Sequence, residues 1–265
     1  MSVQTEIDRI ITAVGAAYDA VEAKGGTAPA AQTIEGLAGA ISGIKSAPAT
    51  PYMVAEYEQV PMTAYESASF IKKAKLYNHT RIAAFEFTQQ YLLQELDMSD
   101  PSNNITTIDT NAFADSMCEN VIIPETVTLI GNSAFSSANI GTMILPGNVT
   151  RVSDFAFQGV IGVNDVAPVI KLNEGLAAIE VGAFNSANIA GEIEIPSTVT
   201  KIGEYCFAYT GITTVICKPT TPPALGSGAF SSDTAGFTIK VPAASVAAYK
   251  AADGWKDYAN YIVAM

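Results

Sequence analysis

The amino-acid sequence predicts a β-rich solenoid of short parallel strands, preceded by a short α-helical hairpin. Phenylalanine recurs at spacings of 26, 22, 22, 27, 23 and 23 residues, and an aliphatic residue lies five positions before each one. Repeats of roughly 20 to 50 residues are typical of solenoids, in which each unit buries its apolar side against its neighbours. The phenylalanines are Phe87, Phe113, Phe135, Phe157, Phe184, Phe207 and Phe230, and their aliphatic partners are Ile82, Ile108, Ile130, Val152, Ile179, Ile202 and Leu225.

Short β-branched runs followed in most units by proline predict one strand in each repeat. Proline ends a strand because it has no amide hydrogen to donate to the neighbouring strand. Alternation in a strand points the first and third residue of each run inward and the middle residue outward. The runs are Val121-Ile122-Ile123, Met143-Ile144-Leu145, Ile170-Lys171-Leu172, Ile193-Glu194-Ile195 and Ile239-Lys240-Val241.

Residues 1–45 differ from the repeats and carry the spacing of amphipathic helices. Apolar residues three and four positions apart predict two helices joined by a Gly-Pro turn, and Thr33 is placed to cap the second. Two short amphipathic helices do not bury both apolar faces alone. We therefore expect this hairpin to pack on copies of itself or on a larger partner.

Composition divides the chain into four predicted parts. Residues 1–45 form a helical attachment or oligomerisation module, and residues 46–52, rich in proline and small residues, form a linker. Residues 53–242 form the solenoid, with an irregular opening unit because terminal repeats usually depart from the pattern. Residues 243–265 form a C-terminal cap. The cap residues expected to cover the open end are Val246, Tyr249, Trp255, Tyr258 and Ile262.

The chain is acidic, with 26 Asp and Glu against 14 Lys and Arg and a formal net charge of −12. An acidic array repels polyanions, so we expect it to bind neither nucleic acid nor anionic lipid. The sequence predicts no secretory signal and no membrane insertion, because no stretch reaches the roughly 20 apolar residues that cross a bilayer. Three cysteines without Cys-x-x-Cys spacing argue against a disulfide framework and a structural zinc site.

No side chain carries the sequence pattern of a catalytic group. His79 is the only histidine, and a packing or surface role fits it better than catalysis. Asp97, Asp100 and Asp109 lie near one another, but their spacing fits no calcium loop, so a solvated surface is favoured over a metal site. The lysine-rich run at 72–75 fits a solvated edge better than a site for an anionic ligand. We therefore predict no catalytic residues, no metal and no cofactor.

The outward strand positions are the candidate binding residues. Neighbouring strands are expected to place them side by side, and Ile122 and Ile144 are expected to face water although they are apolar, which often marks an interface. The alternative is that a loop predicted at 160–168, or a sister subunit, covers them. The candidate ligand-binding residues are Asn120, Ile122, Thr142, Ile144, Val169, Lys171, Glu192 and Glu194.

The repeat resembles the BspA-like leucine-rich repeats of bacterial surface and adhesion proteins over roughly residues 76–262. The segments that carry the resemblance are IPETVTLIGNSAF, IPSTVTKIGEYCF and the closing IKVPAASVAAYKAADGWKDYANYI. The resemblance implies a right-handed leucine-rich-repeat solenoid with a parallel strand face, and mostly loops or short turns on the other side. It also implies binding to proteins or glycans without catalytic residues. Surface proteins of this family usually carry a secretion signal and a wall anchor, and the sequence predicts neither.

The opening segment is similar to the N-terminal module of tailed-phage structural proteins, especially tail fibre and tail-tip components. This similarity covers residues 1–45, from VQTEIDRI to AVEAKGGTAPAAQTIEGLAGAISGI. In such proteins the N-terminal part docks on the virion and the distal part meets the host. Virion proteins leave the cell by lysis, which is consistent with the missing secretory signal.

These observations favour a non-enzymatic, phage tail-associated structural or receptor-binding protein. It would present its leucine-rich-repeat face to a host surface protein or glycan, and residues 1–45 would bind other virion tail proteins. We expect a homo-oligomer, with a trimer favoured, made in the host cytoplasm and located in the virion tail. The alternative is a bacterial cell-surface BspA-like adhesin. A hydrolase would need an acidic cleft that no sequence feature predicts.

Overall fold

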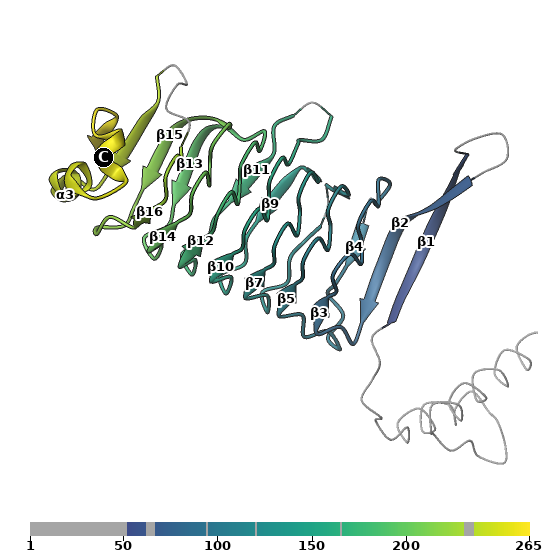
Figure 1. The fold of residues 1–265 in the computed structure, drawn as a ribbon. Helices are drawn as coiled ribbons and strands as arrows, with labels where there is room; N and C mark the ends of the chain where they lie inside the picture. Colours follow the sequence, from purple (N-terminus) through teal and green to yellow (C-terminus); the bar gives the residue numbers. More distant parts are fainter. Residues whose placement is uncertain (1–51, 62–66, 94, 120, 165, 231–235) are drawn as a thin grey trace, which may run out of the picture. The chain divides into compact units, whose positions relative to one another are not determined.

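The computed structural model describes residues 52–61, 67–93, 95–119, 121–164, 166–230 and 236–265. The chain divides into two compact units, Met1–Thr50 and Pro51–Met265, and all described residues belong to the second. The predicted helical hairpin at 1–45 and all of the predicted linker except Tyr52 lie outside the described residues. The second unit is a parallel-strand β-solenoid of about eight turns, whose coils follow one another from β3 to β16 (Figure 1).

One side of the coils carries two-residue strands that end at the predicted aliphatic residues. Seven such strands form one sheet, and every neighbouring pair is parallel. The register places Ile82 beside Ile108 and Ile108 beside Ile130, so the aliphatic side chains form a continuous row. The strands are β3 (Arg81–Ile82), β5 (Thr107–Ile108), β7 (Leu129–Ile130), β10 (Arg151–Val152), β12 (Ala178–Ile179), β14 (Lys201–Ile202) and β16 (Ala224–Leu225).

A row of exposed threonines lies directly before these strands in most coils. The amide and the hydroxyl of Thr128 both donate to the carbonyl oxygen of Thr106, at 2.9 and 3.2 Å. Thr150 repeats this arrangement on Thr128, at 3.0 and 3.3 Å. The threonine directly before these strands therefore joins neighbouring coils through its side chain as well as its backbone.

The other side of the coils carries strands of three to seven residues, again all parallel. They form sheets in the order β11-β9 and β13-β15-β17-β18, and an isolated bridge joins Leu96 to Val121. A third, short pair, β6 with β8, lies between the phenylalanine turn and this side. The strands are β4 (Glu95–Asp97), β6 (Met117–Cys118), β8 (Asn139–Ile140), β9 (Thr142–Ile144), β11 (Val169–Lys171), β13 (Ala190–Ile195), β15 (Gly211–Cys217), β17 (Thr238–Val241) and β18 (Ile262–Ala264).

The predicted phenylalanine column is confirmed. Consecutive rings from Phe87 to Phe230 stack with their centroids 4.9–5.7 Å apart and their planes within 8° of one another. All seven rings are buried, and they belong to one hydrophobic core that runs through the coils. Burying each ring contributes about 1.5–3 kcal/mol relative to leaving it exposed.

A repeated backbone conformation holds each phenylalanine in place. In the coil of Phe157, the residues two before and two after it, Phe155 and Gly159, have left-handed φ angles of 57° and 62°. The amides of these three residues donate to carbonyl oxygens of the next coil at 2.9, 2.7 and 2.8 Å. Left-handed backbone is costly for most residues, so these inter-coil hydrogen bonds help to offset strain. The other coils repeat this left-handed conformation at Phe85, Gln89, Asn111, Asp115, Ser133, Ser137, Gly182, Ser186, Tyr205, Tyr209 and Gly228.

The N-terminal end of the solenoid is a β-hairpin, where the sequence predicts only an irregular opening unit. Strand β1 (Tyr52–Pro61) pairs antiparallel with β2 (Ser67–Tyr77), and β2 pairs in parallel with β4. The register shifts between Glu56, which lies opposite Lys73, and Tyr57, which lies opposite Ile71, and this shift marks a β-bulge. Beyond the bulge, Ala74 and Leu76 alternate inward and cover the first coil. The hairpin therefore packs on the side of the first coil where no preceding coil exists.

Aromatic residues close the C-terminal end. The 3-10 helix η1 (Ala243–Ser245), the helix α3 (Val246–Ala251) and the 3-10 helix η2 (Trp255–Tyr258) lead into the edge strand β18. Tyr249 and Trp255 pack edge to face at 4.8 Å. The Tyr258 hydroxyl accepts the amide of Phe230 at 3.2 Å, a donor that has no further coil to bind. Within the described part of the chain, no helix has the length and apolar character needed to cross a membrane.

Candidate functional site

The predicted alternation along the longer strands is confirmed. Met143 and Leu145 are each 1% exposed, whereas Ile144 between them is 62% exposed. Val121 and Ile123 are likewise buried, and Ile122 between them is 81% exposed. We define the strand face as the outward side of β4, residues 121–123, β9, β11, β13 and β15. Every second residue is exposed along β9 and residues 121–123.

The predicted side-by-side placement is confirmed where β9 and β11 pair. Strands β9 and β11 lie side by side (Figure 1), and their register sets Val169 opposite Thr142 and Lys171 opposite Ile144. Asn120 is outside the described residues. The structure thus brings the middle of the predicted site together on neighbouring coils.

Three adjoining depressions run across this part of the strand face, with volumes of about 320, 370 and 260 Å³. Ile122 lines the first two, and Thr142 lines the second and third. Val169 lines only the third. We call the three together the strand-face groove. It crosses several coils without forming an enclosed cavity, as shallow binding surfaces on solenoids do.

The loop predicted at 160–168 forms one wall of the groove. Val163 and Val166 form a tight antiparallel bridge, and both line the third depression together with Ala167. Val166 is 68% exposed, so the loop adds apolar surface next to Val169. The loop lies beside the candidate residues and does not cover Ile122 or Ile144, both of which stay exposed.

The other end of the groove has an acidic rim that the sequence analysis missed. Glu95 and Asp97 line the first depression, and each forms an ion pair with a lysine of β2, Lys73 at 3.2 Å and Lys75 at 3.1 Å. The lysine run therefore lies on β2, the central strand between β1 and β4, and not on a strand edge. The signal available in the sequence was the alternation in Glu95-Leu96-Asp97, where two acidic residues flank the buried Leu96 as Thr142 and Ile144 flank the buried Met143.

Hydrogen bonds stabilise the charged form of the rim. The hydroxyl and amide of Ser99, followed by Lys75, lower the pKa of Asp97 to about 2. Asp97 in turn raises the pKa of Lys75. Glu119, exposed on the rim of the second and third depressions, adds a further carboxylate. The groove therefore combines an apolar floor with negative charge at its edge.

The last two predicted residues lie elsewhere on the strand face. Glu192 pairs in register with Thr214, and Glu194 forms an ion pair with Lys218. Lys218 also contacts Glu174 at 3.2 Å, and the two carboxylates, Glu194 first, raise its pKa. Neither glutamate lines the groove. The structure therefore separates a polar, ion-paired region on β13 and β15 from the apolar groove.

The side chains weighed as reactive groups have structural contacts. His79 is buried, with Nδ1 2.9 Å from the carbonyl oxygen of Tyr77 and Nε2 3.2 Å from a Glu86 carboxylate oxygen. Asp100 accepts from Ser102, and Asp109 pairs with Arg81. Among the described residues, no group of three or more His, Cys, Asp or Glu side chains is arranged to hold a metal ion.

The three cysteines are free and buried. Burial raises the pKa of Cys118 and of Cys217 to about 12, and it raises that of Cys206 as well. A thiol held in its neutral form is a poor nucleophile. These cysteines are packing residues, as the position of Cys206 before Phe207 suggests.

Stacked coils with two lines of parallel strands and one shared core define a repeat solenoid of the leucine-rich-repeat class. The chain belongs to the BspA type leucine rich repeat region family, whose repeat matches residues 58–167 and 167–249. A leucine-rich repeat protein from Bacteroides ovatus ATCC 8483 is similar with a TM-score of 0.42 and 11% identity, over 71% of this chain and 70% of that one. The pneumococcal vaccine antigen PcpA is similar with a TM-score of 0.26 and 12% identity, over 68% and 63%. No curated protein sequence matches this chain.

Proposed function

We propose that this protein is a non-enzymatic binding protein whose strand-face groove holds the surface of a host protein. The observation that carries the proposal is the run of exposed apolar side chains along the groove, Ile122, Val166 and Val169. Exposed apolar groups gathered in one place mark interaction sites more often than chance. An apolar floor favours a protein partner on this face, and a glycan is the alternative.

The acidic rim narrows the kind of protein surface that fits. Glu119 and the Lys-paired carboxylates of Glu95 and Asp97 border the groove, and the whole chain carries a net charge of −12. Complementary charge raises association rates and rejects partners of like charge. We therefore expect a partner patch with an apolar centre and a neutral or basic margin.

The setting we propose is the tail of a phage, with residues 1–45 attaching the protein to the virion and joining copies into an oligomer, a trimer being favoured. The resemblance of residues 1–45 to tail fibre and tail-tip modules supports this setting. The alternative is a bacterial cell-surface adhesin, which the BspA-type family match supports. Genes for tail proteins beside this gene favour the first setting, and genes for wall proteins favour the second.

The binding face can be tested with single substitutions in the full-length protein. Immobilised protein is probed with surface-protein fractions from candidate host bacteria, before and after protease treatment of the fraction. Ile122→Asp places a charge in the groove and is expected to weaken binding at least about tenfold, the effect of losing a central contact. Lys171→Glu, next to the groove, is expected to have a smaller effect.

Val263→Asp is the matched control. Val263 is also an exposed apolar residue on an outward strand position, but it lies on β18 at the C-terminal edge. The Val263→Asp variant should bind the surface-protein fraction as tightly as the unmodified protein does. Equal binding by Ile122→Asp and the unmodified protein would remove the groove from the proposal, and binding that survives protease treatment would favour a glycan instead.

A further inference from the structure

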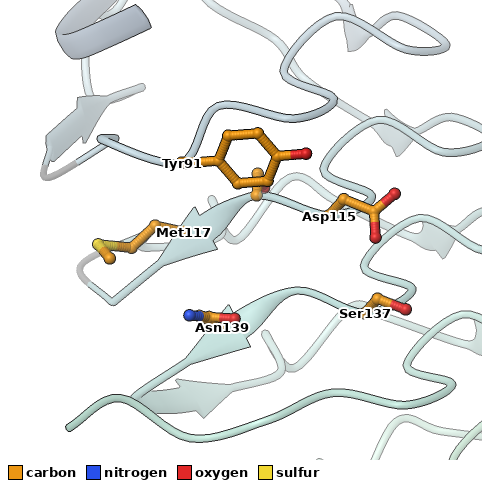
Figure 2. Close-up of a pocket in the computed structure, with 6 residues that line it drawn as sticks. Tyr91, Asp115, Met117, Ser137 and Asn139 are labelled. Carbon is orange, nitrogen blue, oxygen red and sulfur yellow. The ribbon is translucent and has the colours of Figure 1, made fainter. Parts of the chain in front are cut away.

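A second, smaller pocket lies on a different part of the coils, between the phenylalanine turn and the strand face. Six residues from three successive coils line it: Tyr91, Asp115, Ser116, Met117, Ser137 and Asn139 (Figure 2). It shares no lining residue with the strand-face groove. Its volume of about 150 Å³ is below the roughly 300–1,000 Å³ of sites for drug-sized molecules, so it fits a single small ring or end group.

The backbone around this pocket is held firmly by inter-coil hydrogen bonds. Asp115 and Ser137 both occupy the left-handed position two residues after a column phenylalanine, each with a φ of 56°. Their amides donate to Ser136 and Gln158 of the following coils, each at 2.8 Å. The β6–β8 pairing sets Met117 directly beside Asn139. The polar side chains are therefore presented from a fixed frame, which lowers the entropy lost on binding.

The polar groups at the rim of the pocket are available to a ligand. Within the described residues, the side chains of Asp115, Ser137 and Asn139 form no hydrogen bond or ion pair. In contrast, the Ser116 hydroxyl beneath them donates to the carbonyl oxygen of Phe113 at 2.6 Å, so it belongs to the floor. A carboxylate accepts hydrogen bonds, an amide both accepts and donates, and a hydroxyl does the same. This set matches a ligand that carries several neighbouring hydroxyl groups.

Apolar surface completes the pocket. The Tyr91 side chain is half-exposed, and Figure 2 shows its hydroxyl on the side where Asp115 lies. Met117 lies to the left of the ring in this view, and Asn139 and Ser137 follow on the next coil. An aromatic face packs against C–H groups, and a thioether adapts to irregular apolar surfaces. A pyranose ring offers both kinds of surface, with a C–H face and hydroxyls at its edge.

We infer that this pocket binds one neutral hexose unit of a glycan. Tyr91 and Met117 would pack on the C–H face of the sugar, while Asp115, Ser137 and Asn139 would bind its hydroxyls. Anionic sugars are disfavoured because Asp115 and the net charge of −12 repel them. The inference goes beyond the proposed protein contact in the strand-face groove, and it uses none of the residues on which that proposal depends.

The experiment titrates the full-length protein with methyl glycosides of glucose, galactose, mannose and N-acetylglucosamine, with sialic acid as the anionic comparison. Ligand-observed NMR gives the dissociation constants. The expected result is binding of at least one neutral glycoside at about 1–10 mM, weakened about tenfold or more by Tyr91→Leu and by Asn139→Ala. Asp115→Asn removes the charge without disturbing the backbone, because asparagine tolerates left-handed φ, and it should weaken binding several-fold.

Asn188→Ala is the matched control. Asn188 is exposed and occupies the place of Asn139 two coils later, where Ile161 stands in the place of Met117 and Asn139 in the place of Tyr91. It should leave sugar binding unchanged, and thermal melting of each variant confirms that it is folded. The inference is overturned if no neutral glycoside binds at about 50 mM, if sialic acid binds more tightly, or if Tyr91→Leu and Asn139→Ala both bind as the unmodified protein does. Loss of protein binding by Ile122→Asp is a separate result and bears only on the groove.

Discussion

The phenylalanine column and the strand face of the same coils follow opposite rules. Between Phe113 and Phe207 the ring centroids stay 4.9–5.1 Å apart, although the coils between them range from 22 to 27 residues. On the strand face the outward residue of successive strands changes from Ile144 to Lys171 to Glu194. The phenylalanine column sets the spacing of the coils and has the same residue type in every coil. The residue type on the strand face changes from coil to coil. Extra residues leave the column untouched because they project into the loop at 160–168.

The largest effect is expected in the middle of the column. Phe157 has a stacked ring on each side, at 5.1 Å from both Phe135 and Phe184. Phe157→Ala should lower the free energy of unfolding by about 3–5 kcal/mol, since it removes apolar contacts and leaves a cavity. Chemical denaturation followed by circular dichroism measures this loss. A loss below about 1 kcal/mol would mean that the coils do not depend on the shared column.

A smaller, pH-dependent effect is expected where the hairpin meets the first coil. The pKa of Asp97 is about 2 in the folded protein, below its value of roughly 3.9 in an unfolded chain. A lowered pKa means that the stabilisation is complete above about pH 4 and is lost as the pH falls toward 2. Because Asp97 is partly exposed, solvent screening limits the contribution to about 1 kcal/mol.

Asp97→Asn should remove that part of the pH dependence. Melting temperatures of the unmodified protein and of Asp97→Asn are compared at pH 6 and at about pH 2.5, and the difference between them should shrink at the lower pH. Asp100→Asn is the comparison variant with a smaller expected change, since the Asp100 carboxylate accepts hydrogen bonds from Ser102 and forms no ion pair among the described residues. A constant difference at both pH values would contradict the assignment to Asp97.

The smallest effect is expected in the exposed threonine row. Thr128→Val keeps the β-branched shape but removes the hydroxyl that donates to Thr106. We expect a loss of about 0.5–1 kcal/mol, the net contribution of one hydrogen bond. Thr150→Val should give the same value, because its contacts are the same one coil later. Unequal losses would show that the coils are less equivalent than their backbone hydrogen bonds indicate.

The sequence predicts those features that repeat as residue types. The column, the aliphatic row and the strand alternation were predictable because phenylalanine and β-branched residues recur at matching places. The left-handed positions around each phenylalanine were not predictable from the sequence. Asn111, Ser133 and Phe155 share this backbone conformation although their side chains are of different chemical types. One sequence signal for this conformation was present, the pairing of Phe155 with Gly182 in the next coil. A Cβ atom on Gly182 would lie only 2.5 Å from the Phe155 ring. An aromatic residue followed one coil later by glycine at the same place therefore marks this contact.

The candidate site was predictable in its middle and not at its ends. Ile122, Thr142 and Val169 follow from strand alternation and pairing, and the structure gathers them in the groove. The rim formed with Glu95 depends on the hairpin, which occurs once and leaves no repeat to detect. Glu194 was included because its strand position is outward, but its ion pair with Lys218 depends on side-chain reach that alternation does not describe.

Met143 and Ile144 give the most direct test, because they are neighbours on β9 with opposite roles. Met143→Ala should lower the free energy of unfolding by about 2–5 kcal/mol and leave binding per folded molecule unchanged. Ile144 is exposed beside the strand-face groove without lining it, so Ile144→Asp should leave stability within about 0.5 kcal/mol and weaken binding to the surface-protein fraction several-fold. Measuring both quantities on both variants decides the matter. If Ile144→Asp binds as the unmodified protein does, or destabilises it as much as Met143→Ala, the separation of core and binding face is wrong.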